Sequence, residues 1–408
     1  MHEVSHPVVF GFGRQMKVTP YGVGAGRRLA CGMVGLLVGA CAMESVGPNS
    51  VREVTIGILS RERPQSVSVQ CETLRVFAEG TTETPGTTLE VEADGDSVLF
   101  RPSRTARTAS LIVTCAEPLT ITSPAGGPRR YGRRLEIQAR RSALSLRVAV
   151  PFEAYVASVA DAELGELLSA NREPRELRRA MRIVVRSYAL AGLHRHADEG
   201  YDFCDLTHCM HFPGLMPGAE AGEAGPVLLN PRTEQVLPAY FHSTCGGTLA
   251  GPRSAWPEAR DNDLYRSGPD GAGNCARSPH YRWRAEIETD DLLGVLPGVR
   301  SIQDIQLRRV QGRVSLIEVN DGRRTLRLSG MEFVSRAGRA WGWQRIKSNA
   351  FRMRRLSHER YLIEGRGLGH GVGLCQWGAA RLAAEGATAE EIVRYYFPGA
   401  DLVETRSP

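Results

Sequence analysis

The chain has 408 residues, too many for one ordinary hydrophobic core, so we expect two folded units with an appendage. Hydrophobic residues make up 42% of the chain and charged residues 24%, as in a globular protein, and the absence of internal repeats excludes a repeat architecture. A formal net charge of +6 would suit an anionic polymer such as cell wall or nucleic acid, although such charge usually only solvates a surface.

The N-terminal part has the pattern of an export signal. Arg27 and Arg28 precede an apolar run over residues 29–42, which is too short to span a bilayer but suits a signal-peptide core. The run contains Val-Gly-Ala-Cys ending at Cys41, which resembles the lipobox of bacterial lipoproteins. We therefore expect a signal peptide over residues 1–40 and a linker over residues 41–50 that begins with a lipidated Cys41. The alternative is a buried apolar helix of the mature protein.

Residues 51–150 are predicted to be rich in β-strands. Short runs of β-branched and apolar residues, with Gly, Pro, Asp or Ser nearby, predict strands at 54–59, 67–71, 97–101, 111–115 and 144–150. Cys71 and Cys115 each end one of these strands, so a disulfide could join them.

Residues 151–405 are predicted to form a mixed α/β catalytic region. Helices are expected at residues 155–170 and from Asn171, a capping residue, to about His196. Strands and turns should alternate over 281–362, and two more helices should follow at 376–386 and 389–396. The expected fold class is α+β, with a β-rich N-terminal part and a mixed α/β region that holds an extended cleft.

Glu163 is a candidate general acid. It lies between Ala162 and Leu164, near the end of an apolar stretch. A carboxyl group in apolar surroundings has a raised pKa and can donate a proton near neutral pH. The alternative is an exposed glutamate on the surface of a helix.

Residues 201–211 could hold a metal ion. Cys204, His208, Cys209 and His211 offer two thiols and two imidazoles within one short segment. The spacing of the two cysteines is within the range seen for zinc, whereas the spacing of the two histidines is not, and no second ligand pair follows downstream. A zinc site, a disulfide and free thiols all remain open.

Residues 239–247 bring His242, Ser243 and Cys245 together at a strand end. A nucleophilic serine or cysteine beside a histidine could act in catalysis. Strand alternation argues against that pairing, because adjacent residues point to opposite faces. Cys275 lies further along the chain and could pair with Cys245.

Residues 365–379 are rich in glycine and contain His370, Gln376 and Trp377. The segment lacks the Gly-Lys-Ser/Thr of a Walker loop and the spacing of a dinucleotide site. We interpret it as the glycine-lined floor of a cleft that presents these three side chains to an extended substrate, since a tryptophan face can stack on a sugar ring. The alternative is a tight structural loop with Trp377 in the core.

Taken in this order, the motifs resemble those of the stage II sporulation protein D (SpoIID/LytB) family. The resemblance rests on residues 186–189, 204–209, 242–247, 365–379 and 395–399. It implies a lytic transglycosylase that cleaves the bond between N-acetylmuramic acid and N-acetylglucosamine in peptide-stripped glycan strands and leaves 1,6-anhydro products.

The resemblance also implies roles for single residues. Glu163 matches the position of the catalytic glutamate, and Glu166, three residues further on, is its rival because the family's usual sequence after that glutamate is changed here. The residues implied to contact substrate are Arg186, Tyr188, His242, Ser243, His370, Gln376 and Trp377.

No cofactor is expected to be required, and the one candidate is a structural zinc held by Cys204, His208 and Cys209. The expected partners are peptidoglycan glycan strands, a cell-wall amidase and, through the lipid anchor, the membrane, but not nucleic acid. The protein would face the periplasm or cell wall. Two other functions remain open: a non-enzymatic cell-wall binding protein or amidase enhancer, and a zinc- or thiol-dependent hydrolase that uses Cys204, His208, Cys209 and Cys245.

Overall fold

The computed structural model describes residues 51–405 except 79–80, 102–105, 166, 169–173, 208 and 272. The expected signal peptide, Cys41, Asn171, Glu166 and His208 therefore lie outside the described residues. Within the described part of the chain, no helix is both long and apolar enough to cross a bilayer.

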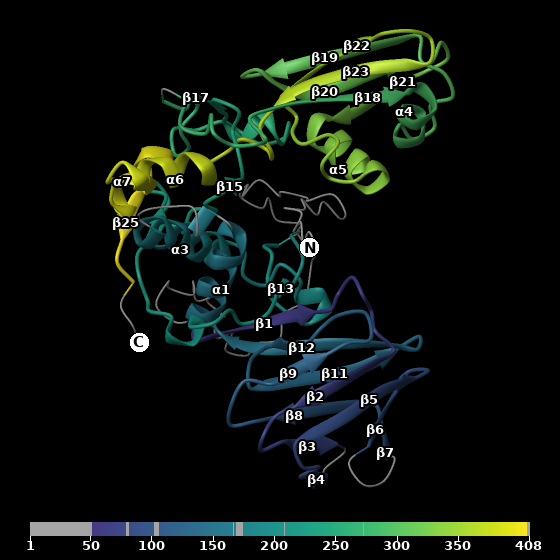
Figure 1. The fold of residues 1–408 in the computed structure, drawn as a ribbon, viewed down its shortest axis with the longest axis vertical. Helices are drawn as coiled ribbons and strands as arrows, with labels where there is room; N and C mark the ends of the chain where they lie inside the picture. The colour runs from purple at the N-terminus through teal and green to yellow at the C-terminus, as the bar shows by residue number, and fades with distance from the viewer. Residues whose placement is uncertain are drawn as a thin grey trace, which may run out of the picture.

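The N-terminal part consists of two β-sheets packed against each other (Figure 1). Side chains alternate along the strands, so that Val67 and Val69 are buried while Gln70 is exposed. The larger sheet has the order β13-β1-β12-β11-β8-β3-β4, with β1 Glu53–Ile58, β3 Arg75–Ala78, β4 Thr81–Glu83, β8 Ser110–Thr114, β11 Arg134–Arg140, β12 Ala143–Pro151 and β13 Phe203–Cys204. The smaller sheet has the order β10-β9-β2-β5-β6-β7, with β2 Ser66–Gln70, β5 Thr88–Asp94, β6 Ser97–Arg101, β7 Ala106–Thr108, β9 Thr120–Thr122 and β10 Arg129–Arg130.

The predicted strands match β1, β2, β6, β8 and β12 closely. Cys71 and Cys115 form a disulfide between the end of β2 and the end of β8, which are 44 residues apart in sequence. The bond thus joins a strand of one sheet to a strand of the other. The edge strand β13 comes from beyond the sandwich in sequence and runs parallel to β1, with Cys204 beside Gly57.

Four helices form the middle of the molecule, where α6 and α7 pack on α3 and α3 packs on α1 (Figure 1). Their bounds are α1 Phe152–Leu164, α3 Pro174–Ala191, α6 Gln376–Ala384 and α7 Ala389–Tyr396. The buried stripe predicted for α3 is confirmed, because Leu177, Met181 and Val184 are inaccessible to solvent. The predicted end of α1 at residue 170 is wrong: the helix ends at Leu164, where Gly165 takes a positive φ of 46°.

Residues 282–366 form a third part with a hydrophobic core of its own, at the top of Figure 1. Two three-stranded sheets and two helices surround this core. They are β18 Arg282–Glu288, α4 Thr289–Val295, β19 Asp304–Val310, β20 Arg313–Asn320, β21 Thr325–Ser329, α5 Gly330–Trp341, β22 Phe351–Arg355 and β23 Arg360–Arg366. Strands were predicted here from the sequence, but as part of the catalytic region and not as a separate unit.

Three short two-stranded pairings connect the remaining segments. They comprise β14 Val227–Leu229 with β25 Asp401–Val403, β15 Phe241–His242 with β24 Leu374–Cys375, and β16 Thr248–Leu249 with β17 Gly268–Pro269. The parallel pair of β15 and β24 brings two of the predicted motifs side by side, with His242 opposite Cys375.

Candidate active site

Glu163 lies one residue before the end of α1, and its side chain is only partly exposed. The backbone N–H of His211 donates a hydrogen bond to its Oε1 over 2.9 Å. Burial raises the pKa of this carboxyl group from 4.5 to about 7, and hydrogen bonds from His211 and Gln376 limit the rise. The carboxyl group is therefore partly protonated at neutral pH and remains within reach of a ligand.

Gln376 begins α6 and is buried against the end of α1. Its side-chain amide donates to the backbone carbonyl oxygen of Glu163 over 3.1 Å. The next residue, Trp377, is partly exposed, and its backbone N–H donates to the carbonyl oxygen of Ser243 over 3.1 Å. The structure thus brings Glu163, Gln376, Trp377 and Ser243 together from three distant segments.

His242 and His370 lie deeper, with their ring centroids 5.5 Å apart. Only 1% of His242 and 7% of His370 is exposed. Burial lowers the pKa of both imidazoles, that of His370 to about 3, so both are neutral. His242 Nδ1 lies 3.1 Å from the carbonyl oxygen of Val372, whereas its buried Nε2 has no hydrogen-bond partner among the described residues.

Arg186 and Tyr188, which the sequence placed in contact with substrate, are both buried in α3. The Arg186 guanidinium forms an ion pair with Glu153 of α1, with Nε 3.1 Å from Oε1, and also donates to the carbonyl oxygens of Glu223 and Pro226. The Tyr188 hydroxyl accepts a hydrogen bond from Arg195 over 2.9 Å. The polar groups of these two side chains are thus engaged within the protein, and the pair of Arg186 and Glu153 joins α3 to α1.

A first sulfur cluster lies at the edge strand β13. The Sγ atom of Cys209 is 3.4 Å from that of Cys204 and 3.3 Å from Nε2 of His196. His196 was not predicted as a ligand, and its only signal in the sequence was its position upstream of the two cysteines. Nδ1 of His196 lies 2.7 Å from Glu199, which orients the ring toward the sulfurs. His211 instead contributes its backbone to the Glu163 site.

A second sulfur cluster consists of Cys245, Asp270, Cys275 and Cys375. Cys275 was predicted as a possible partner of Cys245, and their sulfurs lie 3.3 Å apart as free thiols. Asp270 and the approach of Cys375 were not predicted from the sequence.

A cavity of about 490 Å³ is lined by Cys245 of the second sulfur cluster and mostly by residues of the unit formed by residues 282–366. Five arginines contribute to its lining: Arg282, Arg309, Arg313, Arg352 and Arg366. Glu163 is not part of this lining, so the cavity is distinct from the candidate acid site.

The SpoIID family, described as stage II sporulation protein, matches residues 140–226. Over this segment the chain is similar to the SpoIID family. The matched segment contains Glu163 and the first sulfur cluster, whereas Gln376 and the second sulfur cluster lie outside it.

Three curated proteins are similar to this chain over short or moderate stretches. Stage II sporulation protein D of Bacillus amyloliquefaciens is 28% identical over 193 residues, which is 46% of this chain and 51% of that protein. The protein of the same name in Bacillus subtilis (strain 168) is 51% identical over 42 residues, or 10% of this chain and 12% of that protein. An uncharacterized protein of Brachyspira hyodysenteriae is 46% identical over 43 residues. The aligned part thus spans at most about half the length of these relatives.

Proposed function

We propose that this chain acts on the bacterial cell wall as a lytic transglycosylase that cleaves peptide-stripped glycan strands. One observation carries the proposal: Glu163 is a partly exposed carboxyl group with a pKa of about 7, held by the backbone of His211. Such a group can donate a proton and take one back at the same pH.

The proposed reaction needs only this one carboxyl group. Protonated Glu163 gives its proton to the glycosidic oxygen between N-acetylmuramic acid and N-acetylglucosamine, and the bond from that oxygen to C1 breaks. The resulting carboxylate then accepts the proton of the C6 hydroxyl of the same muramoyl residue, whose oxygen bonds to C1. The attacking hydroxyl belongs to the substrate and is already positioned, so no water molecule has to be activated. The product is a 1,6-anhydro sugar, and Glu163 is protonated again.

Trp377 supports a sugar substrate at this place. Its side chain is partly exposed, and the preceding residue, Gln376, contacts Glu163. An indole ring offers an apolar face against which a sugar can pack. The carbonyl oxygen of Ser243 accepts a hydrogen bond from the backbone N–H of Trp377, which fixes Trp377 beside the candidate acid.

The test is the digestion of peptide-free glycan strands, with products analysed by mass spectrometry. Purified parent chain is compared with Glu163→Gln, Glu166→Gln and a control, Glu385→Gln, which removes an exposed carboxylate paired with Arg381 at the end of α6. We expect anhydro-muramoyl products from the parent, Glu166→Gln and Glu385→Gln chains, and none from Glu163→Gln. Loss of products in Glu166→Gln alone would assign the acid to that residue.

If the folded parent chain bound strands without cleaving them, the lyase proposal would fail. The chain would then be a cell-wall binding protein or an amidase enhancer, and its effect on a partner amidase would be measured next. Inhibition by thiol reagents with Glu163→Gln still active would instead indicate a thiol-dependent hydrolase.

We propose that the chain is exported and anchored to the membrane through a lipid on Cys41. The support is the apolar run after Arg27 and Arg28 that contains Val-Gly-Ala-Cys. Metabolic labelling with a fatty-acid analogue should label the parent chain, and Cys41→Ser should abolish the label and release the chain from the membrane fraction.

We also propose a structural zinc ion at the first sulfur cluster. His196, Cys204 and Cys209 place three suitable ligand atoms within 4.8 Å of one another, and Glu199 holds the imidazole in place. The ion would tie β13 to the segment after α3. The sequence had assigned His208 in place of His196, and His208 lies outside the described residues.

A further inference from the structure

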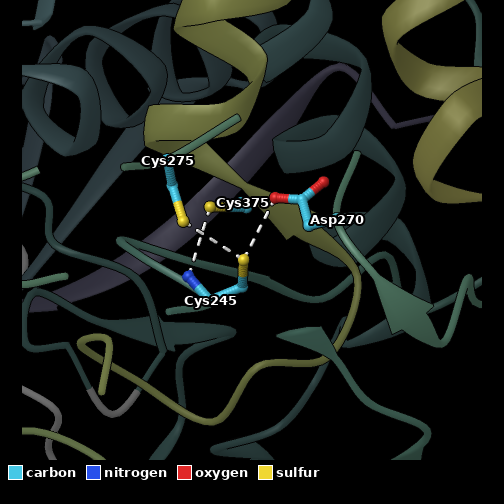
Figure 2. A group of neighbouring side chains, drawn as sticks. All are labelled: Cys245, Asp270, Cys275 and Cys375. Atoms are coloured by element: carbon cyan, nitrogen blue, oxygen red, sulfur yellow. Dashed lines mark hydrogen bonds between the residues drawn. The ribbon is translucent and has the colours of Figure 1, made fainter. Parts of the chain in front are cut away.

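Four buried side chains of the second sulfur cluster converge on one point (Figure 2). Cys245 follows β15, Asp270 and Cys275 belong to the loop after β17, and Cys375 ends β24 immediately before α6. Their ligand atoms, three sulfurs and one carboxylate oxygen, all lie within 4.8 Å of one another. Three segments that are distant in sequence therefore meet at a single set of potential metal ligands.

The spacing of these atoms is close to that of a tetrahedral metal site. Sγ of Cys245 lies 3.3 Å from Sγ of Cys275 and 3.0 Å from Oδ2 of Asp270. In a tetrahedral site with zinc–sulfur bonds of about 2.3 Å, the sulfurs are about 3.8 Å apart. Side-chain movements of roughly half an ångström would thus open the cluster enough to hold an ion.

Asp270 is oriented as a metal ligand would be. Its Oδ1 accepts hydrogen bonds from Nδ2 of Asn274 over 3.2 Å and from the hydroxyl of Tyr395 over 3.3 Å, which leaves Oδ2 facing Cys245. Such outer hydrogen bonds typically orient metal-binding carboxylates. Asp270 has no exposed surface, and no described basic side chain forms an ion pair with it. A buried carboxylate is costly unless a cation or a proton neutralises it.

The buried guanidinium of Arg313 is a second charged group beside the second sulfur cluster, and it also fits a bound metal ion. Arg313 is 2% exposed and donates to the carbonyl oxygens of Cys245 and Gly369, over 2.9 and 3.3 Å. Among the described residues, no carboxylate forms an ion pair with it. Three thiolates and one carboxylate around a divalent cation would carry a net negative charge, which this buried guanidinium would offset.

We propose that Cys245, Asp270, Cys275 and Cys375 bind a zinc ion with a structural role. All four ligand positions are filled by protein and all four residues are buried, as in a closed structural site and unlike a catalytic one. The ion ties the segment after β15 and the loop after β17 to the start of α6. It binds whether or not the chain cleaves glycans.

A disulfide is the competing use of these sulfurs. A bond between Cys245 and Cys275 would leave the third thiol and the carboxylate of Asp270 facing each other without a cation. The two uses are mutually exclusive at Cys245, so one experiment separates them.

The experiment uses the full-length chain with Cys204→Ser and Cys209→Ser, which removes the first sulfur cluster. The protein is purified without chelator, and its zinc content is measured by inductively coupled plasma mass spectrometry. We expect one zinc per chain in this background and a loss of that zinc on adding Cys275→Ser. Replacing zinc by cobalt should give the intense visible absorption of a tetrahedral thiolate site, and Asp270→Asn should alter that spectrum.

Zinc-free protein that also fails to bind added zinc or cobalt after reduction would overturn the proposal. So would a Cys245–Cys275 peptide found by mass spectrometry after alkylation of the unreduced chain. Circular dichroism checks that each variant folds. If Cys275→Ser does not fold, the zinc content and cobalt spectrum of the background chain alone decide the outcome.

Discussion

The side-chain amide of Gln376 donates to the backbone carbonyl oxygen of Glu163 over 3.1 Å, although the two residues are 213 positions apart in sequence. Because Gln376 is buried and begins α6, the contact fixes the end of α1 against the start of another helix. The surroundings that raise the pKa of Glu163 therefore depend on tertiary packing as well as on the neighbours of this residue in sequence.

The rate of glycan cleavage should fall as the pH rises through about 7, since Glu163 must be protonated to act as an acid and its pKa is about 7. An ordinary glutamate would lose its proton near pH 4.5 instead. The measurement is kcat/KM on peptide-free strands across the pH range. A rate that already fell with rising pH near 4.5 would contradict the assignment of Glu163 as the acid.

The free energy of unfolding should also depend on pH through the protonation of Glu163. The folded-state pKa of Glu163 lies above its ordinary value, so the folded chain binds the proton more tightly than the unfolded chain between about pH 4.5 and 7. The stability that this proton contributes is present at low pH and is lost as the pH rises to about 7. The loss is up to about 3 kcal/mol, from a shift of roughly two and a half pKa units.

Urea unfolding of the parent and Glu163→Gln chains on both sides of this pH window measures the effect. The other titrating groups are common to both chains and cancel in the difference. We expect Glu163→Gln to gain stability relative to the parent as the pH rises, and a difference independent of pH would show that the pKa of Glu163 is not raised.

Gln376→Met should slow cleavage and shift the alkaline limb of the pH–rate profile to higher pH. The substitution keeps the volume of this buried side chain but removes a hydrogen bond that lowers the pKa of Glu163. Gln306→Met, on the exposed side of β19, is the matched control. Loss of rate with an unshifted profile would mean that Gln376 only supports the packing of α6.

Arg186→Met should destabilise the fold by about 3–5 kcal/mol, because it leaves the partly buried carboxylate of Glu153 without its ion-pair partner. Adding Glu153→Met should recover much of that loss, because both charges are then gone. Thermal unfolding of the two variants tests this. If Arg186→Met kept its stability but lost strand binding, Arg186 would be a substrate-binding residue after all.

The strands of residues 51–150 and the buried face of α3 could be predicted from sequence, because side-chain alternation and helical spacing are local patterns. The apolar neighbours of Glu163 likewise indicated a raised pKa. His196 and Asp270 could not be found in this way, since each joins its cysteines only through the tertiary fold. The separate core of residues 282–366 was also missed, because a strand pattern does not show which sheet a strand joins.

The position of β13 limits where the chain can be cut when its domains are used in chimeric proteins. β1 pairs with β12 on one side and with β13 on the other, and Asp202 and Asp205 beside β13 accept hydrogen bonds from the backbones of Thr55 and Leu59. A chimera cut at residue 150 would therefore take the sandwich without its edge strand and expose the unpaired backbone of β1, a site for aggregation. A graft that preserves solubility has to carry the segment around β13 together with the sandwich.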